Sequence, residues 1–334
     1  MQDPTLTVIW ALIIAIGIAA YVVMDGFDLG IGILFKGFSV GKERNMAMNA
    51  IAPVWDGNET WLVLGGGGLL AAFPLAYAVI LPALYAPLIA MLLGLVFRGV
   101  AFEFRWRDPG HRAFWDFGFS AGSLVATFAQ GITLGALLQG IEVEGRAYGG
   151  GWWDWLTPFS LLCGVALVIG YAALGACWLV MKTTGEIQAD ARRYAVWTVP
   201  ALLAAIGAVS LATPFVEPQY FERWFERPGL FATIPMPLLV AGAAFMAWRD
   251  LRAGRDYRPF FWVLALFLLA MVGLGVSIWP DVIPGRVSIF DAAAPRESQI
   301  FMLVGAAVLV PLIAGYTAWA YWVFRGKVDE AGYH

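Results

Sequence analysis

Charged residues are scarce in this chain, and their scarcity excludes an ordinary soluble domain. Asp, Glu, Lys and Arg make up 13% of the 334 residues, whereas 60% are hydrophobic. A soluble globular domain has about 25% charged and about 45–50% apolar residues. A transmembrane barrel would show short alternating strands, but the apolar stretches here are continuous. The composition therefore predicts an all-α polytopic membrane protein, with residues 1–334 forming one integral membrane domain.

Cysteine and histidine are also rare, with two residues of each. Cys163 and Cys177 would lie about 21 Å apart along one continuous helix and cannot form a disulfide with each other. His111 falls in a predicted loop and His334 is the last residue, so no predicted span contains a histidine. Haem iron is commonly held by His, Met or Cys in a protected pocket, which makes this chain a poor candidate to hold a b-type haem alone. No metal-ligand cluster or nucleotide motif appears, and no nucleic acid is expected as a partner.

Nine apolar stretches are each long enough to cross a bilayer, which takes about 20 mainly apolar residues in a helix. They run over residues 8–34, 54–72, 74–101, 117–139, 158–181, 198–215, 234–248, 260–279 and 300–324. Connecting loops that are rich in Lys and Arg alternate along the chain with loops that have few. Fifteen of these residues fall on one side of the predicted membrane and five on the other. By the positive-inside rule, we expect nine transmembrane helices with the N-terminus outside and the C-terminus cytoplasmic.

Six polar residues are expected at a similar depth, near the cytoplasmic ends of the first three spans. They are Asp25 and Asp28 in the first span, Asp56, Asn58 and Glu59 in the second, and Arg98 in the third. An ionisable group in hydrocarbon is costly, so such residues are functional candidates by default. Because acids, an amide and water can relay protons, the functional interpretation is a proton route from the cytoplasm.

These residues also have structural interpretations. Asp56 and Glu59 have the spacing of a capping box at the start of the second span. Asp28 could lie at the membrane interface where the first span ends. Asp25 and Arg98 could form a buried ion pair that ties the first span to the third.

Two neighbouring features favour plain structural roles. Glu103 and Arg105, at the end of the third span, are expected to be solvated. Four consecutive glycines at residues 65–68 lie inside the second span. They lack the Lys and Ser/Thr of a phosphate loop and therefore indicate close helix packing.

Several segments resemble subunit II of cytochrome bd-type quinol oxidases. They are residues 26–32, 52–62, 97–105, 115–118, 183–186, 291–292, 298–299 and 316–319. The block Trp-Asp-Gly-Asn at residues 55–58 is the most specific of them. The short linkers and compact length are similar to the cyanide-insensitive branch of that family.

The resemblance implies a haem-free subunit built from two four-helix bundles plus one peripheral helix. It implies a larger partner, subunit I, which carries haems b and d, oxidises quinol and reduces O2 to water in the bacterial cytoplasmic (inner) membrane. A small single-span accessory subunit, lipids and quinone would be further partners. In such a complex Asp56 is the best candidate for the proton route, assisted by Asp25, Asn58 and Glu59. Asp28 and Arg98 are candidates for buried charge pairing.

Two rival functions remain open at this point. A proton- or ion-coupled transporter would also use inner-leaflet acids and a glycine-rich span. Transporters usually place their site near the midplane, whereas the acids here lie toward one face. The other rival is a purely structural scaffold for the haem subunit.

Overall fold

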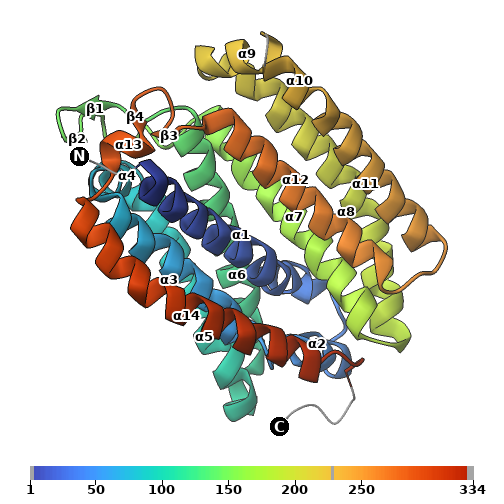
Figure 1. Cartoon of the computed structure of the whole chain (residues 1–334). Helices are drawn as coiled ribbons and strands as arrows, with labels where there is room; N and C mark the ends of the chain where they lie inside the picture. The colour runs from blue at the N-terminus through green and yellow to red at the C-terminus, as the bar shows by residue number, and fades with distance from the viewer. Residues whose placement is uncertain (1–3, 227–228, 329–334) are drawn as a thin grey trace.

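Long helices make up most of the chain (Figure 1). The computed structural model describes residues 4–226 and 229–328. The longest helices of that part are α1 (Pro4–Leu34), α3 (Trp55–Ala72), α5 (Tyr85–Arg107), α6 (Arg112–Leu138), α7 (Pro158–Lys182), α8 (Gly185–Ala212), α11 (Pro235–Arg252), α12 (Arg258–Ile278) and α14 (Arg296–Val323). Seven helices within the described residues are long and apolar enough to cross a membrane. This confirms the prediction of an all-α polytopic membrane protein.

α3 and α11, which coincide with the expected second and seventh spans, are not among those seven. Each has 18 residues. α3 begins with several polar residues, including Asp56 and Glu59, and α11 ends with Arg249, Asp250 and Arg252. These residues lower the mean hydropathy of the two helices, so the count of nine spans stays a prediction.

The expected third span, over residues 74–101, is wrong as a single helix. It divides at Leu84 into α4 (Pro74–Ala83) and α5. Pro87, in the first turn of α5, has no N–H to donate to the carbonyl of Ala83, and in a continuous helix its ring would clash with that carbonyl. Because proline is tolerated in the first turn of a helix, α5 begins anew at Tyr85.

The two ends of the molecule carry different short elements (Figure 1). The end nearer the N-terminus has the antiparallel hairpins β1 (Val143–Glu144) with β2 (Ala147–Tyr148) and β3 (Asp281–Ile283) with β4 (Val287–Ser288). It also has η3 (Thr213–Phe215), α9 (Pro218–Phe225), α10 (Gly229–Thr233) and α13 (Ile289–Ala292). The opposite end has η1 (Phe35–Gly37), α2 (Lys42–Asn49) and η2 (Pro109–His111). The basic loops lie at this opposite end, which we call the basic end.

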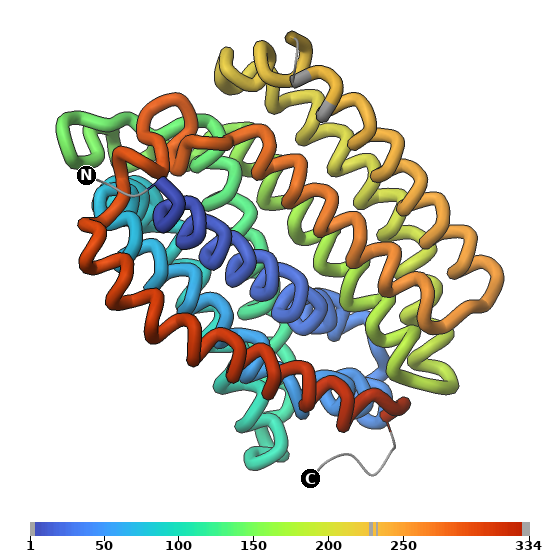
Figure 2. The backbone as a smooth tube through the Cα atoms, viewed as in Figure 1, coloured from blue at the N-terminus to red at the C-terminus, as the bar shows by residue number. Residues whose placement is uncertain are grey.

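α1 is central and packs against α3, α6 and α7, while α5 packs along α6 (Figure 2). α7 packs in turn on α8 and α12, and α11 lies against both α8 and α12. α14 is outermost: it touches α1 and α3, and none of its most apolar segment is buried. α1, α3, α5 and α6 therefore lie together on one side of the molecule.

Paired glycines allow the closest helix crossings. A Cβ atom on Gly30 of α1 would lie 1.9 Å from the carbonyl oxygen of Tyr171 on α7, and one on Gly175 would lie 2.5 Å from the carbonyl carbon of Gly30. Small residues let membrane helices approach this closely. Because the crossing lies just beyond Asp28, it fixes the level of the acidic residues of α1 relative to α7.

The glycine run of α3 packs closely at two of its four positions. A Cβ atom on Gly65 would lie 3.1 Å from Ile18, and one on Gly68 would lie 3.0 Å from Ile14, both on α1. The other two glycines of the run have nothing within 4 Å of such an atom. The predicted close packing is therefore confirmed for the face of α3 that meets α1.

Candidate functional site

Asp25 of α1 and Arg98 of α5 form an ion pair in the protein interior. Nη2 of Arg98 donates a hydrogen bond to Oδ1 of Asp25, and both side chains are fully buried. Oε2 of Glu59, on α3, lies 4.0 Å from Nη1 of Arg98, and the Glu59 side chain is 25% exposed. The ring of Trp55 lies beside the guanidinium group, with its centroid 5.5 Å from Cζ of Arg98. Charges from three successive long helices thus meet at one point.

Asp28 is joined to α3 and α14 by hydrogen bonds through Asn58. Nδ2 of Asn58 donates to Oδ2 of Asp28 at 2.7 Å and to the carbonyl oxygen of Met24 at 3.4 Å. On its other side, Oδ1 of Asn58 accepts a hydrogen bond from the hydroxyl of Tyr321 at 2.8 Å. Asp28 is fully buried inside the protein, and its position at the membrane interface stays a prediction. Its Oδ1 atom has no hydrogen-bond partner among the described residues.

Asp56 lies on the exposed start of α3, outside this buried set. The helix begins one residue earlier, with Val54 as its N-cap, and no side chain makes a capping hydrogen bond. The capping-box interpretation of Asp56 and Glu59 is therefore wrong. The negative charge of Asp56 acts on Glu59 through space. From the surface inward, the order of the charges is Asp56, Glu59, and then Arg98 with Asp25.

The basic end holds a second buried charge cluster, which the sequence analysis missed. Arg105 of α5 is fully buried, and its Nε donates to Oδ1 of Asp116 on α6 at 2.5 Å. Its Nη1 donates to Oδ1 of Asn45 at 2.7 Å, and Nη1 of Arg44 donates to Oδ2 of Asp116 at 2.8 Å. The expectation that Arg105 is solvated is therefore wrong, whereas Glu103 is exposed as expected. These bonds tie α2 to the α5–α6 pair.

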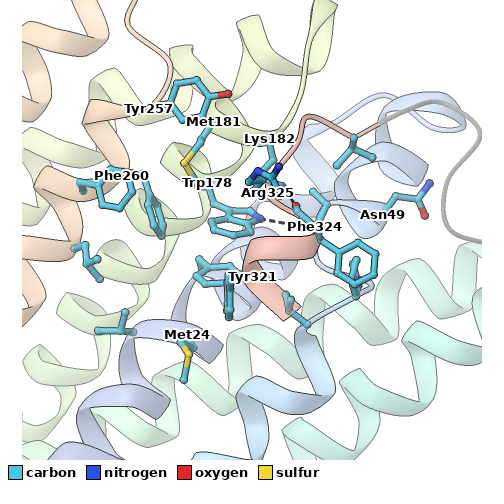
Figure 3. A pocket seen from close by; sticks show the side chains of 18 residues that line it. Met24, Asn49, Trp178, Met181, Lys182, Tyr257, Phe260, Tyr321, Phe324 and Arg325 are labelled. Carbon is cyan, nitrogen blue, oxygen red and sulfur yellow. Dashed lines mark hydrogen bonds between the residues drawn. The ribbon is translucent and has the colours of Figure 1, made fainter. Parts of the chain in front are cut away.

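A cavity of about 490 Å³ lies beside the Asn58 network, between α1, α7, α12 and α14 (Figure 3). Its lining is mainly apolar and includes Phe27 and Trp178, whose rings stack with centroids 4.0 Å apart. Tyr321 belongs to both features, because its ring lines the cavity while its hydroxyl bonds to Asn58. Tyr321 therefore links the lining of the cavity, through Asn58, to the buried acid Asp28.

Potential metal ligands are scattered over the residues that the structure describes. Among them, no three or more His, Cys, Asp or Glu side chains are grouped so as to hold a metal ion. His111 is 75% exposed, and its Nδ1 lies 3.0 Å from Oδ2 of Asp108 at the α5–α6 turn. His334 lies outside the described residues. That this chain binds no haem by itself stays a prediction.

Comparisons with known proteins agree over nearly the whole chain. The sequence profile of the family described as cytochrome bd terminal oxidase subunit II matches residues 6–324. The chain is 31% identical to the cytochrome bd-I ubiquinol oxidase subunit 2 of Escherichia coli, over 96% of this chain and 95% of that protein. It is 28% identical to the cytochrome bd ubiquinol oxidase subunit 2 of Bacillus subtilis, with 96% of each chain covered.

A solved structure supports the fold. One chain of the bd oxidase from Geobacillus thermodenitrificans superimposes with a TM-score of 0.77 and 16% identity, covering 97% of this chain and 100% of that one. At this identity the likeness concerns the fold alone. The family match, by contrast, favours the oxidase interpretation over the transporter. The chain therefore belongs to the cytochrome bd terminal oxidase subunit II family.

Proposed function

We propose that this chain is the haem-free subunit II of a bd-type terminal oxidase that oxidises quinol and reduces O2 to water. Family membership makes it a subunit of an oxidoreductase in the bacterial inner membrane. Its main partner is a larger subunit I, which holds haems b and d and the quinol site. A small single-span subunit, lipids and quinone are further partners. The absence of histidine from every predicted span supports leaving haem ligation to the partner.

The proposed topology has nine spans in a single membrane domain of residues 1–334. α1, α3, α5 and α6 form one four-helix bundle, α7, α8, α11 and α12 form the second, and α14 is peripheral. The packing of α1 on α3 and α6 and of α7 on α8 supports this grouping. The excess of Lys and Arg at the basic end supports a cytoplasmic C-terminus.

Thiol labelling tests this topology. Single cysteines are introduced by Gly145→Cys in the β1–β2 turn or by Val40→Cys in the exposed segment before α2, after Cys163 and Cys177 are replaced by Ala. In intact spheroplasts a membrane-impermeant maleimide should label only the Gly145→Cys protein. If only the Val40→Cys protein is labelled, the orientation in the membrane is the opposite of the proposed one.

The subunit supplies protons from the cytoplasm through Asp56 and Glu59 to the buried Asp25. The observation that carries this proposal is the position of Glu59. It lies within electrostatic reach of the exposed Asp56 and 4.0 Å from Arg98, which is paired with Asp25. Arg98 stays protonated at all ordinary pH values, so it holds the acids in place and transfers no proton. Asp28, about one turn nearer the basic end on α1, is a further buried acid of this polar set and is bonded to Asn58 of α3.

Asp56→Asn and Glu59→Gln in the whole oxidase test this route. Each variant should keep its haem content, but its rate of quinol-driven oxygen uptake should fall about tenfold or more. A positioned side chain that transfers a proton accelerates a reaction by at least that factor. Glu103→Gln is the matched control, because Glu103 is an exposed acid at the same end of the molecule. Normal uptake in both route variants would remove the proton role. Loss of the haem subunit on purification would favour a scaffolding role instead.

A further inference from the structure

Tyr321 is held in place by contacts that do not need its hydroxyl group. The residue lies near the end of α14, the outermost helix, and is half-buried. Its ring meets Phe27 edge-on with centroids 6.4 Å apart and Trp178 edge-on at 6.1 Å. Figure 3 shows Tyr321 beside Trp178. These aromatic contacts stabilise the ring position, so the hydroxyl is available for a separate role.

That hydroxyl faces Asn58, a polar group that links α14 to the buried acid Asp28. It donates to Oδ1 of Asn58 at 2.8 Å, and Nδ2 of the same amide donates to Oδ2 of Asp28 at 2.7 Å. A hydrogen-bonded chain therefore runs from the wall of the cavity, through one amide, to a carboxyl group that is fully buried. Removing the first group of the chain would leave the buried carbonyl of Asn58 without its donor.

The amide of Asn58 has two different ends, and this makes its orientation depend on both neighbours. The NH2 end only donates and the carbonyl end only accepts. An ionised Asp28 is an acceptor and takes the NH2 end, as the structure shows. A protonated Asp28 keeps acceptor capacity but gains an O–H donor, which the carbonyl end of a reversed amide can accept. A phenol both donates and accepts, so Tyr321 can bond to the amide in either orientation.

We infer that Tyr321 is a positioning residue of the proton route: its hydroxyl keeps the Asn58 amide bonded to Asp28 in both protonation states of that acid. The inference rests on the proposed function, because it matters only if these acids carry protons. Asp28 takes up one proton and releases one, while Tyr321 and Asn58 keep their own. The outermost helix thereby becomes part of the route, although its apolar segment packs little against the rest of the subunit.

Tyr321→Phe in the whole oxidase is the direct test, since it removes the hydroxyl and keeps the ring. The maximal rate of quinol oxidation should fall about three- to tenfold, the effect expected of one lost hydrogen bond. The KM for quinol should not change, and the solvent deuterium isotope effect on turnover should rise. Tyr316→Phe is the matched control, because Tyr316 is on the same helix and 68% exposed. It should behave like the wild type.

A double-mutant cycle separates positioning from a merely structural role. If Tyr321 acts through Asn58, then adding Tyr321→Phe to Asn58→Ala should slow turnover per haem no further. Additive effects would overturn the inference, and so would normal turnover per haem in Tyr321→Phe when Asn58→Ala is slow. If Asp56→Asn, Glu59→Gln and Asn58→Ala all turn over normally, the proposed proton route itself is wrong. The two failures are therefore distinguishable.

Discussion

Lys182, at the end of α7, donates a hydrogen bond from its ammonium group to the backbone carbonyl oxygen of Phe324, at the end of α14. The same group donates to the carbonyl oxygen of Gly326 at 2.6 Å, and the N–H of Val328 donates back to the carbonyl oxygen of Lys182 at 2.8 Å. The last carbonyls of a helix have no partner within it. At the basic end, the outermost helix is thus fastened to the body of the protein by these bonds.

Lys182→Met should loosen this fastening. Hydrogen bonds to a charged group contribute about 1.5–3 kcal/mol, so residues 324–328 should exchange amide hydrogens faster and be cut sooner by trypsin after Arg325 and Lys327. Arg193→Met, which changes a mostly exposed cation on α8, is the control. An unchanged cleavage rate in Lys182→Met would mean that other contacts hold the end of α14.

Replacing only one partner of the Asp25–Arg98 ion pair should strongly destabilise the subunit. Arg98→Met leaves Asp25 buried without its partner, which should destabilise the subunit by about 3–5 kcal/mol and lower the yield of assembled oxidase. Asp25→Leu combined with Arg98→Met removes both charges and should recover most of the yield. The measurement is the haem-bearing complex purified per cell mass. A double variant as poor as the single would argue that packing, and not the unpaired charge, is responsible.

Gly30→Ala should prevent α1 from crossing α7. The added methyl would lie 1.9 Å from the carbonyl oxygen of Tyr171, and a backbone atom cannot move aside as a side chain tip can. We expect little or no assembled oxidase in membranes by immunoblot and haem spectrum. Gly66→Ala is the matched control, because an added methyl there meets nothing within 4 Å. Near-normal assembly of the Gly30→Ala protein would contradict the proposed closeness of the crossing.

Asp256, in the turn between α11 and α12, should make stability depend on pH. Burial raises the pKa of its carboxyl, but the hydrogen-bonded cations Lys327 and Arg192 help to outweigh burial and hold that pKa below its usual range. A carboxyl whose pKa is lowered by folding stabilises the fold at pH values above its pKa in the unfolded chain, which is about 4. This contribution is lost as the pH falls through the pKa in the folded protein.

Asp256→Asn is the variant that checks this dependence. At pH 7 its melting temperature should be roughly 1–3 °C lower than that of the wild type, as expected for a partly exposed ion pair worth up to about 1 kcal/mol. The difference should shrink below about pH 4, where the wild-type carboxyl also loses its charge. A difference that stays constant from pH 7 to pH 3 would show that the lost charge is not its cause.

The convergence of Asp25, Glu59 and Arg98 could be predicted from the sequence because three successive spans with alternating direction place these residues at one depth. Depth does not say which side of a helix faces inward. Asp56, the best candidate that the resemblance implies, lies at the exposed start of α3, and Glu59, three residues further along, reaches the buried pair.

Other parts of the site depend on packing that no local pattern reveals. Arg105 has the sequence context of a loop cation, but it is buried and bonded to Asp116 and Asn45 from two other helices. The one signal was Asp116, an acid just before an apolar run. Tyr321 gave none, since an aromatic residue near the end of an apolar helix is commonplace at a membrane interface. Similarly, the division of the third span at Leu84 follows from Pro87, which the apolar run concealed.

The contact between Gly30 and Gly175 limits how charge can travel in this subunit. The backbones of α1 and α7 lie so close here that a single Cβ atom on either glycine would meet backbone atoms of the other helix. We therefore expect the backbone at Asp25 and Asp28 to keep its position relative to α7, while the side-chain torsions of the two acids change. On the proposed role, each proton is passed on by small rotations of side chains, and the reorganisation that accompanies every transfer stays local and inexpensive.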